Sequence, residues 1–285
     1  MLEAIHISHT FEAGLPPTRW AVEDVSMEVK AGETLLLTGP SGSGKTTLAR
    51  ILAGLEPPSQ GTVRLDSEDL YGGDQGCTPA SGQVAMAFQY PERQFFADSV
   101  WEELRWGLQL GLGLEGEALT ARLVKVAKDL DLPLEEVARR PPRRLSSGQQ
   151  RKIALASLLA LEPRILILDE PLTGLHTRER KRLAELLSRW PARKRGMVVI
   201  AHELELFLPW ATTVAVLATG RLVFLGSSAE LVATGDPAVL SAVYLPPLIE
   251  ISSSLRRHGL SDGPVSNDVS VVLDQVRRAV KRGSR

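Results

Sequence analysis

The feature that most limits what this chain can fold into is the run Gly39-Pro-Ser-Gly-Ser-Gly-Lys45-Thr46-Thr47. It follows an apolar run over Thr34–Thr38 and precedes a helical pattern over Leu48–Gly54. A strand, a glycine-rich turn and a helix in this order form a loop whose backbone N–H groups surround a phosphate at a helix N-terminus. The residues expected to contact the nucleotide are Gly39, Pro40, Ser41, Gly42, Ser43, Gly44, Lys45, Thr46 and Thr47.

Two side chains of this loop carry the charge and the metal chemistry. Lys45 brings a positive charge to the β- and γ-phosphates, and the Thr46 hydroxyl can ligate Mg²⁺. The alternative is a chance turn of Gly and Ser, but the flanking strand and helix are the context that the motif requires. The sequence therefore predicts a site for a nucleoside triphosphate.

Length, charge and cysteine content narrow the class of protein. A chain of 285 residues is long enough for one α/β nucleotide-binding domain with an appendage. A formal net charge of −1 gives no basic footprint for nucleic acid. A single cysteine, Cys77, cannot form an internal disulfide, which favours a reducing compartment. We expect no membrane span and no signal peptide, since no apolar run reaches about 18 residues and the N-terminus lacks a basic region before an apolar core.

A second strand motif supplies adjacent carboxylates. The run Ile165–Leu168 is continuously apolar, as in strands buried in parallel sheets, and Asp169 and Glu170 follow it directly. Because α/β folds place ligands at the carboxyl ends of their strands, Asp169 suits the Mg²⁺ shell and Glu170 suits orienting and deprotonating a water. The alternative is that Asp169 and Glu170 are only surface charges. A chain that already has a phosphate loop favours the functional interpretation.

A third apolar strand, Met197–Ala201, ends on His202. A lone histidine is usually structural or exposed. At the carboxyl end of a buried strand, however, His202 is a candidate for a hydrogen bond to the γ-phosphate. Two further runs, 212–217 and 222–225, predict a closing hairpin.

Residues 91–145 read as an all-helical insert between these strands. Helical periodicity runs over 100–108 and 115–140. The first helix carries an apolar face that fits either core packing or a groove for a partner, formed by Trp101, Leu104 and Leu108 with aromatic residues nearby. Ser146 and Gly148 then precede a helix over 150–161, as an N-cap and a second anion site would, although any helix can begin with Ser-Gly.

The two ends of the chain give weaker signals. Phe11 and Trp20 lie in or beside the loop between two N-terminal strands, where either can stack on a purine but simple packing is more common. Pro246-Pro247 marks a boundary before two amphipathic candidates, 248–257 and 269–280. The basic end of the tail is most often a solvated helix face, with membrane headgroups or nucleic acid as minority interpretations.

Together and in order, these motifs resemble those of the ATP-binding subunit of an ABC transporter, over residues 1 to about 230. The set comprises the phosphate loop at 39–46, a Gln loop at Gln89, the signature Leu145-Ser-Ser-Gly-Gln149, Ile165-Leu-Ile-Leu-Asp-Glu-Pro171 and the switch residue His202. The run Gln89-Tyr-Pro-Glu-Arg-Gln94-Phe95 further resembles the Gln loop of energy-coupling-factor (ECF) ATPases, which serve vitamin and transition-metal uptake. The stretch Thr10–Pro16 and an extension from Pro246 also fit, which makes Phe11 the preferred base-stacking residue.

The resemblance implies a fold and a division of the chain. The expected fold is an α/β P-loop NTPase: a RecA-like mixed sheet with an antiparallel β subdomain, an inserted helical subdomain and a small C-terminal helical extension. The ATP-binding domain would cover 1–235, with the helical subdomain at about 91–147, and the extension over 236–285 would serve dimerisation.

The resemblance also implies a mechanism. Two subunits close head to tail around two Mg-ATP molecules, each held between the phosphate loop of one subunit and the signature of the other. The signature residues in question are Ser146, Ser147, Gly148 and Gln149. Glu170 would activate the water, and His202 and Gln89 would sense the γ-phosphate. The implied ligands of Mg²⁺ are Thr46, Gln89 and Asp169.

The implied partners sit in or at a membrane. They are a second ATPase subunit of the same or a different chain, a transmembrane coupling protein docked near 89–106, and a membrane protein that captures the solute. Nucleic acid is not among them. The chain would lie at the cytoplasmic face of the cell membrane without spanning it, and would drive uptake of a vitamin or a metal ion.

Two residues depart from the family pattern. Ser147 stands where the family usually has Gly, and His176 where it has Asp. Ser147 keeps the backbone N–H that an anion needs, whereas His176 removes a carboxylate expected at the subunit interface. We therefore hypothesise that this subunit is a weakened partner in a heterodimer with two unequal ATP sites.

Other classes of function fit less well. Soluble ABC ATPases of repair or translation usually carry two cassettes or a long coiled-coil insertion, and neither is present. P-loop GTPases and small-molecule kinases lack the signature and the switch histidine. A subunit that only binds ATP is disfavoured by the presence of Lys45, Asp169, Glu170 and His202.

Overall fold

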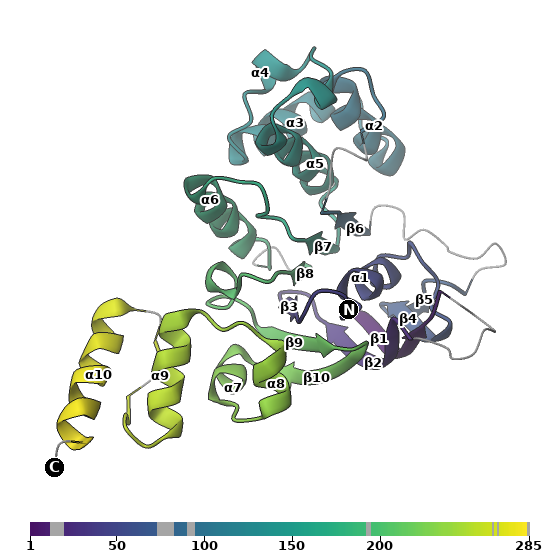
Figure 1. Cartoon of the computed structure of the whole chain (residues 1–285). Coiled ribbons are helices and arrows are strands. Elements are labelled where there is room, and N and C mark those ends of the chain that lie inside the picture. Colours follow the sequence, from purple (N-terminus) through teal and green to yellow (C-terminus); the bar gives the residue numbers. More distant parts are fainter. Residues whose placement is uncertain are drawn as a thin grey trace.

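A computed structural model describes the chain over residues 1–11, 20–72, 83–89, 95–191, 195–263, 265–266 and 268–283. It shows two β-sheets, a group of helices inserted between strands, and a helical C-terminal part (Figure 1). Three stretches interpreted from the sequence lie outside the described residues: 12–16 of the N-terminal stretch, the loop over 73–82 with Cys77, and the run after Gln89 over 90–94.

The larger sheet has six strands in the order β10-β9-β3-β8-β7-β6. Its members are β3 (Thr34–Thr38), β6 (Val84–Ala87), β7 (Ile165–Asp169), β8 (Gly196–Ile200), β9 (Thr213–Ala218) and β10 (Arg221–Gly226). All neighbouring pairs are parallel except β9 and β10, which form the predicted hairpin. The fold is the predicted α/β P-loop NTPase with a mixed sheet.

The central strands are buried on both faces, which explains their continuous apolar sequences. Every residue of β3, β7 and β8 is buried. Alternate side chains enter two different cores: Leu36 packs with the cluster that includes the helical insert, whereas Leu35 and Leu37 pack with the cluster around α1 (Lys45–Leu52). This period of two is the pattern of a strand with a layer on each side.

The smaller sheet is antiparallel and has the order β2-β1-β4-β5. It consists of β1 (Leu2–His9), β2 (Val22–Val29), β4 (Gln60–Leu65) and the short β5 (Glu68–Asp69). Its buried side chains join the core around α1, so this sheet packs against the phosphate-loop side of the larger one (Figure 1).

The insert is helical, as expected, and lies beyond the β6 and β7 edge of the sheet (Figure 1). It contains α2 (Val100–Leu112), α3 (Gly116–Asp129), α4 (Leu134–Val137), a 3₁₀ turn (Pro142–Arg144) and α5 (Ser147–Leu161). The helical pattern predicted over 115–140 is interrupted, because Asp131 has a φ of 53° and Pro133 follows it. The helix predicted from residue 150 begins at Ser147, since Ser146 and Gln149 form a capping box.

After α6 (Thr177–Ser188) and β8, a 3₁₀ turn (Leu204–Leu206) leads into the β9–β10 hairpin. Four helices follow the hairpin. These are α7 (Ser228–Ala233), α8 (Pro237–Ala242), α9 (Pro247–Arg257) and α10 (Val269–Gly283). The last two pack side by side, and a buried hydrogen bond of 2.6 Å joins the Ser252 hydroxyl to the Gln275 side-chain oxygen (Figure 1). The domain boundary at 235 and the dimerisation role stay predictions. Among the described residues, none of the helices has the length and apolar character needed to cross a membrane.

Candidate nucleotide-binding site

The phosphate loop lies between the end of β3 and the start of α1, and two of its glycines are required by space. A Cβ on Gly39 would stand 2.0 Å from the carbonyl oxygen of Leu217, and one on Gly44 would stand 2.1 Å from that of Ala21. Both glycines also have positive φ, 141° and 100°. The loop therefore packs directly against the backbone at Leu217 and Ala21, and only glycine fits at these two positions.

A cleft of about 900 Å³ opens beside this loop. Its lining is Phe11, Trp20, Ala21, Glu23, Pro40, Ser41, Gly42, Ser43, Gly44, Lys45, Thr46, Thr47, Ala218, Thr219 and Gly220. Both aromatic residues weighed from the sequence thus reach the cleft, and the ring of Phe11 packs edge-on against His9 with centroids 4.8 Å apart. Phe11 remains 65% exposed, which leaves its face open to a planar ring. Its role as the base-stacking residue stays a prediction.

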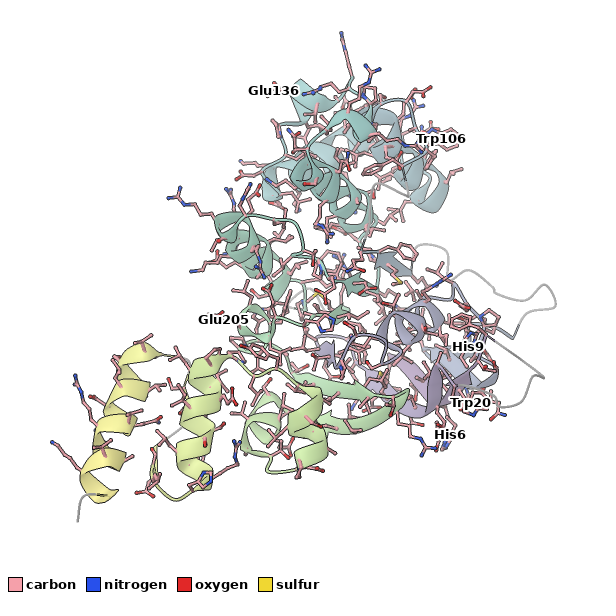
Figure 2. All side chains as sticks on the ribbon, in the orientation of Figure 1. His6, His9, Trp20, Trp106, Glu136 and Glu205 are labelled. Carbon is pink, nitrogen blue, oxygen red and sulfur yellow. The ribbon has the colours of Figure 1, made fainter. Side chains whose placement is uncertain are left out.

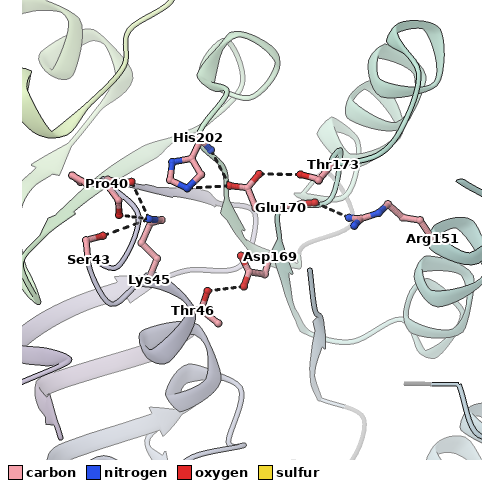
Figure 3. A network of polar contacts seen from close by, with 10 residues as sticks. Pro40, Ser43, Lys45, Thr46, Arg151, Asp169, Glu170, Thr173 and His202 are labelled. Carbon is pink, nitrogen blue, oxygen red and sulfur yellow. Dashed lines mark hydrogen bonds and ion pairs between the residues drawn. The ribbon is translucent and has the colours of Figure 1, made fainter. Parts of the chain in front are cut away.

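Lys45 is buried in the loop and points its amine at the loop's own backbone. The Nζ atom donates to the carbonyl oxygens of Gly39 at 2.9 Å and Pro40 at 2.8 Å, and lies 3.4 Å from the Ser43 hydroxyl (Figure 3). Burial lowers the pKa of Lys45, and the carboxylates of Glu170 and Asp169 oppose that shift. The loop holds this cation at the place where phosphate oxygens are expected.

Thr46 and Asp169 form a pair that suits a magnesium ion. The Thr46 hydroxyl donates to Asp169 Oδ2 at 2.8 Å, and Asp169 is 3% exposed (Figure 3). Burial raises the pKa of Asp169, while the Thr46 hydrogen bond and the Lys45 charge act in the opposite direction. Among the described residues, no group of three or more His, Cys, Asp or Glu side chains is arranged to hold a metal ion by itself. One hydroxyl and one carboxylate fit Mg²⁺, which takes few protein ligands and completes its shell with phosphate and water oxygens.

Glu170 follows Asp169 in a constrained conformation. Its φ of 49° lies in the left-handed region, which is uncommon for a residue other than glycine. Its carboxylate accepts from the backbone N–H of His202 at 3.2 Å and from the Thr173 hydroxyl at 3.4 Å (Figure 3). Burial raises the pKa of Glu170, and the charge of Asp169 raises it further. A carboxylate with a raised pKa is a better general base.

His202 completes this group from the end of β8. Its Nε2 atom lies 3.6 Å from Glu170 Oε1. Burial, followed by the charge of Lys45, lowers the pKa of His202 and favours the neutral imidazole. The sheet explains the gathering, because β3, β8 and β7 are adjacent and parallel, so their carboxyl ends meet at one edge.

The signature residues are not brought to this site within the chain. Ser146 caps α5: its hydroxyl accepts from the Gln149 N–H at 3.3 Å, and its own N–H donates to the Gln149 side chain at 3.2 Å. Ser146 and Ser147 are exposed, and none of the four signature residues lines the cleft. The N-terminus of α5, where a helix can bind an anion, is therefore not part of the cleft beside the phosphate loop of its own chain.

The departure at His176 lies beside the signature. A Cβ on Gly148 would stand 3.7 Å from the side chain of Leu175 and 3.8 Å from that of Glu179, so the two segments are neighbours. His176 is exposed, and its N–H donates to Glu179 at 3.4 Å. The two sequence departures, at Ser147 and His176, therefore fall on the same side of the molecule.

Gln89 is linked to Glu170 by Arg151, a residue that the sequence analysis did not single out. The carbonyl oxygen of Gln89 accepts from Nη2 of Arg151 at 2.6 Å, and Nη1 of Arg151 donates to the carbonyl oxygen of Glu170, also at 2.6 Å. The sequence signal that could have identified Arg151 is its charge within a helix whose residues Ile153 and Leu155 are apolar. In the structure both are buried, as is Arg151, and a buried charge needs partners.

Comparison with known proteins agrees with this geometry. The profile of the ABC transporter family matches residues 22–173. The energy-coupling factor transporter ATP-binding protein EcfA2 of Thermotoga maritima is 35% identical over 245 residues, which cover 86% of this chain and 89% of that protein. The protein of the same name from Symbiobacterium thermophilum is 34% identical over 279 residues, covering 96% of this chain and 93% of its own.

Solved structures share the fold. A dimeric ATP-binding cassette in a post-hydrolysis state with ADP and phosphate superposes with a TM-score of 0.73 at 24% identity, over 80% of this chain and 99% of that one. The cbiO1 protein of Clostridium perfringens, part of the ABC transporter complex cbiONQ, gives a TM-score of 0.70 at 24% identity, over 90% and 96% of the two chains.

Proposed function

This chain belongs to the ABC transporter family as an ATPase subunit of the energy-coupling factor type, and we propose that it powers uptake of a vitamin or a metal ion by hydrolysing Mg-ATP in a head-to-tail pair with a second ATPase subunit. The single observation that carries the proposal is the division of the ATP motifs. The phosphate loop, Asp169, Glu170 and His202 meet at one sheet edge, whereas the signature lies exposed on the helical insert.

ATP is expected in the cleft beside the phosphate loop. The backbone N–H groups of the loop and the α1 N-terminus would hold the phosphates, with the Lys45 amine exchanging carbonyl partners for phosphate oxygens. Phe11 would stack on the base. Thr46 and Asp169, with Gln89, would hold Mg²⁺, which neutralises charge on the transferred phosphoryl group.

The hydrolytic step is assigned to Glu170. Its carboxylate stands next to His202 and takes up a proton from a water in line with the γ-phosphate, as its raised pKa favours. The His202 N–H holds the carboxylate in place, and the neutral imidazole is free to donate to a γ-phosphate oxygen. Lys45 offsets the charge that builds up there.

The second half of each site is expected from another ATPase chain. The N-cap and first turn of α5, Ser146–Gln149, present N–H groups at a helix N-terminus. None of these four residues lines the cleft beside the phosphate loop of the same chain. A partner chain turned head to tail brings this end to a γ-phosphate. The His176 departure keeps a heterodimer with unequal sites as part of the proposal.

An exposed apolar group on the helical insert supports docking of a membrane partner. Phe96, Trp106 and Leu110 are 68%, 43% and 77% exposed, and Trp106 lies on the helical insert (Figure 2). The rings of Phe96 and Trp106 pack edge to face with their centroids 6.2 Å apart. The other half of the α2 face is core, since Leu104 and Leu108 are buried. The core interpretation of the Leu104 and Leu108 face is therefore confirmed, and docking of a partner on the exposed group stays a proposal. Apolar side chains grouped on a surface mark a partner site.

The experiment is affinity purification of the tagged full chain from detergent-solubilised native membranes, with its partners identified by mass spectrometry. The proposal expects a transmembrane coupling protein, a small solute-capture membrane protein and a second ATPase chain. The capture protein then identifies the solute class. Recovery of soluble partners alone would contradict the proposal and favour a non-transport ABC ATPase.

A matched pair of variants tests whether the α2 surface makes this contact. Trp106→Ser should abolish recovery of the transmembrane protein while ATP hydrolysis by the isolated chain is unchanged. Leu225→Ser, at an apolar residue 45% exposed on β10, should leave recovery as in the wild type. Equal recovery with both variants would place the membrane contact elsewhere.

A further inference from the structure

Arg151 is a buried charge that joins the signature helix to the catalytic segments of the same chain. It lies in the second turn of α5 and is 7% exposed. One of its terminal nitrogens donates at 2.6 Å to the carbonyl oxygen of Glu170 (Figure 3), and the other donates at 2.6 Å to that of Gln89. One guanidinium therefore ties the helical insert to the residue that follows β7 and to the segment that follows β6.

The backbone of Glu170 needs such a contact. Its φ of 49° is held by an N–H bond to the Ile200 carbonyl at 3.0 Å, by a bond from the Thr173 N–H to its own carbonyl at 3.2 Å, and by Arg151. The Arg151 bonds carry a formal charge, which makes them stronger than the two neutral ones. Because the orientation of this backbone sets the place of the carboxylate, Arg151 acts on catalysis through Glu170.

The junction between α6 and the helix that bears Arg151 contains unfilled space. A cavity of about 170 Å³ lies between α5 and α6, lined in part by Leu155, Leu175 and Leu183. Close packing normally resists relative motion of two elements, and an unfilled space between them reduces that resistance. The Arg151 bonds bridge the same junction, so a shift of α5 pulls on the carbonyls of Glu170 and Gln89.

We propose that Arg151 is a positioning residue that couples the two ATP sites of the ATPase pair. The inference rests on the proposed function, in which the α5 N-terminus of one chain binds the γ-phosphate held by the other. Engagement of the signature at one site then sets, through Arg151, the position of Glu170 at the other site. Such coupling is a free-energy link between sites and makes hydrolysis cooperative in ATP.

The geometry also says which substitution breaks the link. The planar guanidinium presents two donors in a fixed fork, whereas a lysine ammonium cannot hold two carbonyls in the same arrangement. Arg151→Lys keeps the charge, and Arg151→Gln keeps one amide donor without it. Arg122→Lys is the matched control, since Arg122 also donates to a carbonyl, that of Ala160 at 3.0 Å, but at the far end of α5.

The experiment measures ATP affinity, kcat and the Hill coefficient of the ATPase pair, assembled from the full chain and the second ATPase subunit recovered with it, for both Arg151 variants and the control. We expect a loss of kcat of about tenfold, a Hill coefficient close to 1 and an ATP affinity within about twofold of wild type, as for the loss of charged hydrogen bonds. Arg122→Lys should match wild type. Equal kcat and Hill coefficient in Arg151→Lys and Arg122→Lys would overturn the proposal, as would a loss of ATP affinity as large as the loss of kcat.

A double variant separates action through Glu170 from a general structural effect. In a Glu170→Gln background, Arg151→Lys should leave the residual rate unchanged, because the group that it positions is already inactive. A further tenfold loss would overturn the proposal. An assembled wild-type pair that hydrolyses ATP without cooperativity would count against the head-to-tail arrangement instead. The ratio of the wild-type and Arg151→Lys kcat values would still test whether Arg151 positions Glu170.

Discussion

The two faces of the ATP site differ in how completely a single chain builds them. The phosphate-loop face is held by short contacts among strand ends: Lys45 to its own loop, Thr46 to Asp169, and His202 to Glu170. The signature face is a helix N-terminus whose cap is satisfied locally and whose outer residues, Ser146 and Ser147, are exposed. Within the described residues, a single chain brings the phosphate-loop face together but not the signature face, and the proposed function assigns the signature face to the site of a partner chain.

The difference also shows where sequence change is tolerated. At the phosphate-loop face, Gly39 and Gly44 leave no space for a Cβ, and Asp169 is buried. Both family departures, Ser147 and His176, fall on the signature face, where the side chains are exposed. Under the proposed function, changes at these exposed positions leave the fold intact and act on the ATP site of a partner chain.

The largest effect is expected from the catalytic carboxylate. Glu170→Gln should lower kcat by about a thousandfold, because general base catalysis is removed, while ATP affinity is kept. Steady-state hydrolysis and binding of a fluorescent ATP analogue measure the two quantities. A variant that keeps more than a tenth of the wild-type kcat would remove Glu170 from the role of base.

Next in size is the loop cation. Lys45→Ala should weaken ATP binding and hydrolysis together, by about a hundredfold, because one charge on the phosphates is lost. Lys125→Ala, at an exposed lysine of α3, is the charge-matched control and should bind as the wild type does. Equal binding by the two variants would contradict the placement of the phosphates.

A change at the signature face should reduce hydrolysis without affecting ATP binding at the phosphate-loop face. Gly148→Ala adds a methyl group that meets its neighbours only at ordinary contact distances of 3.7 and 3.8 Å, so the fold should be unaffected. ATP binding to the chain's own loop should be unchanged, while hydrolysis falls about tenfold because the methyl group crowds the γ-phosphate of the partner site. Thermal denaturation serves as the control for folding, and parallel losses of binding and hydrolysis would contradict the division.

His176→Asp should restore the carboxylate that the family has at this position. It also places a negative charge at the N-terminus of α6, which is stabilising by up to about 1 kcal/mol. An equal gain at the subunit interface in the transition state corresponds to a rate gain of up to about fivefold. ATP titration of both proteins measures the rate and the Hill coefficient. Strong cooperativity in the wild type at the rate of the variant would refute the hypothesis of unequal sites.

The smallest effect concerns pH. The Lys152 hydrogen bond lowers the pKa of Glu179 from its ordinary 4.5, so this carboxylate adds stability above that pH and loses it as the pH falls through the folded pKa. For a surface pair the contribution is small, and Glu179→Gln should lower Tm by about 1 °C at pH 7 and not at pH 3. A decrease in Tm that is larger at pH 3 than at pH 7 would contradict the lowered pKa of Glu179.

Most of the fold and the phosphate-loop face could be predicted from the sequence, because their signals are local. Strands β3, β7 and β8 are mostly apolar runs. The phosphate loop follows β3, Glu170 follows β7 directly, and His202 lies two residues after β8. The interruption near Asp131 was missed, since periodicity continues across it. Arg151 was missed because its two partners lie 19 and 62 residues away in the chain, and no spacing rule connects them.

The most direct test of the central claim uses ATP with a photoreactive group on its γ-phosphate. The Lys45→Ala chain, which should not hold ATP in its own loop, is irradiated alone and then with an ATP-binding partner, either the wild-type chain or the second ATPase of the complex. The account predicts labelling of Ser146–Gln149 of the variant chain in the mixture and none when the variant is alone. Absence of that label in the mixture, or equal label without a partner, would contradict a site shared between two chains.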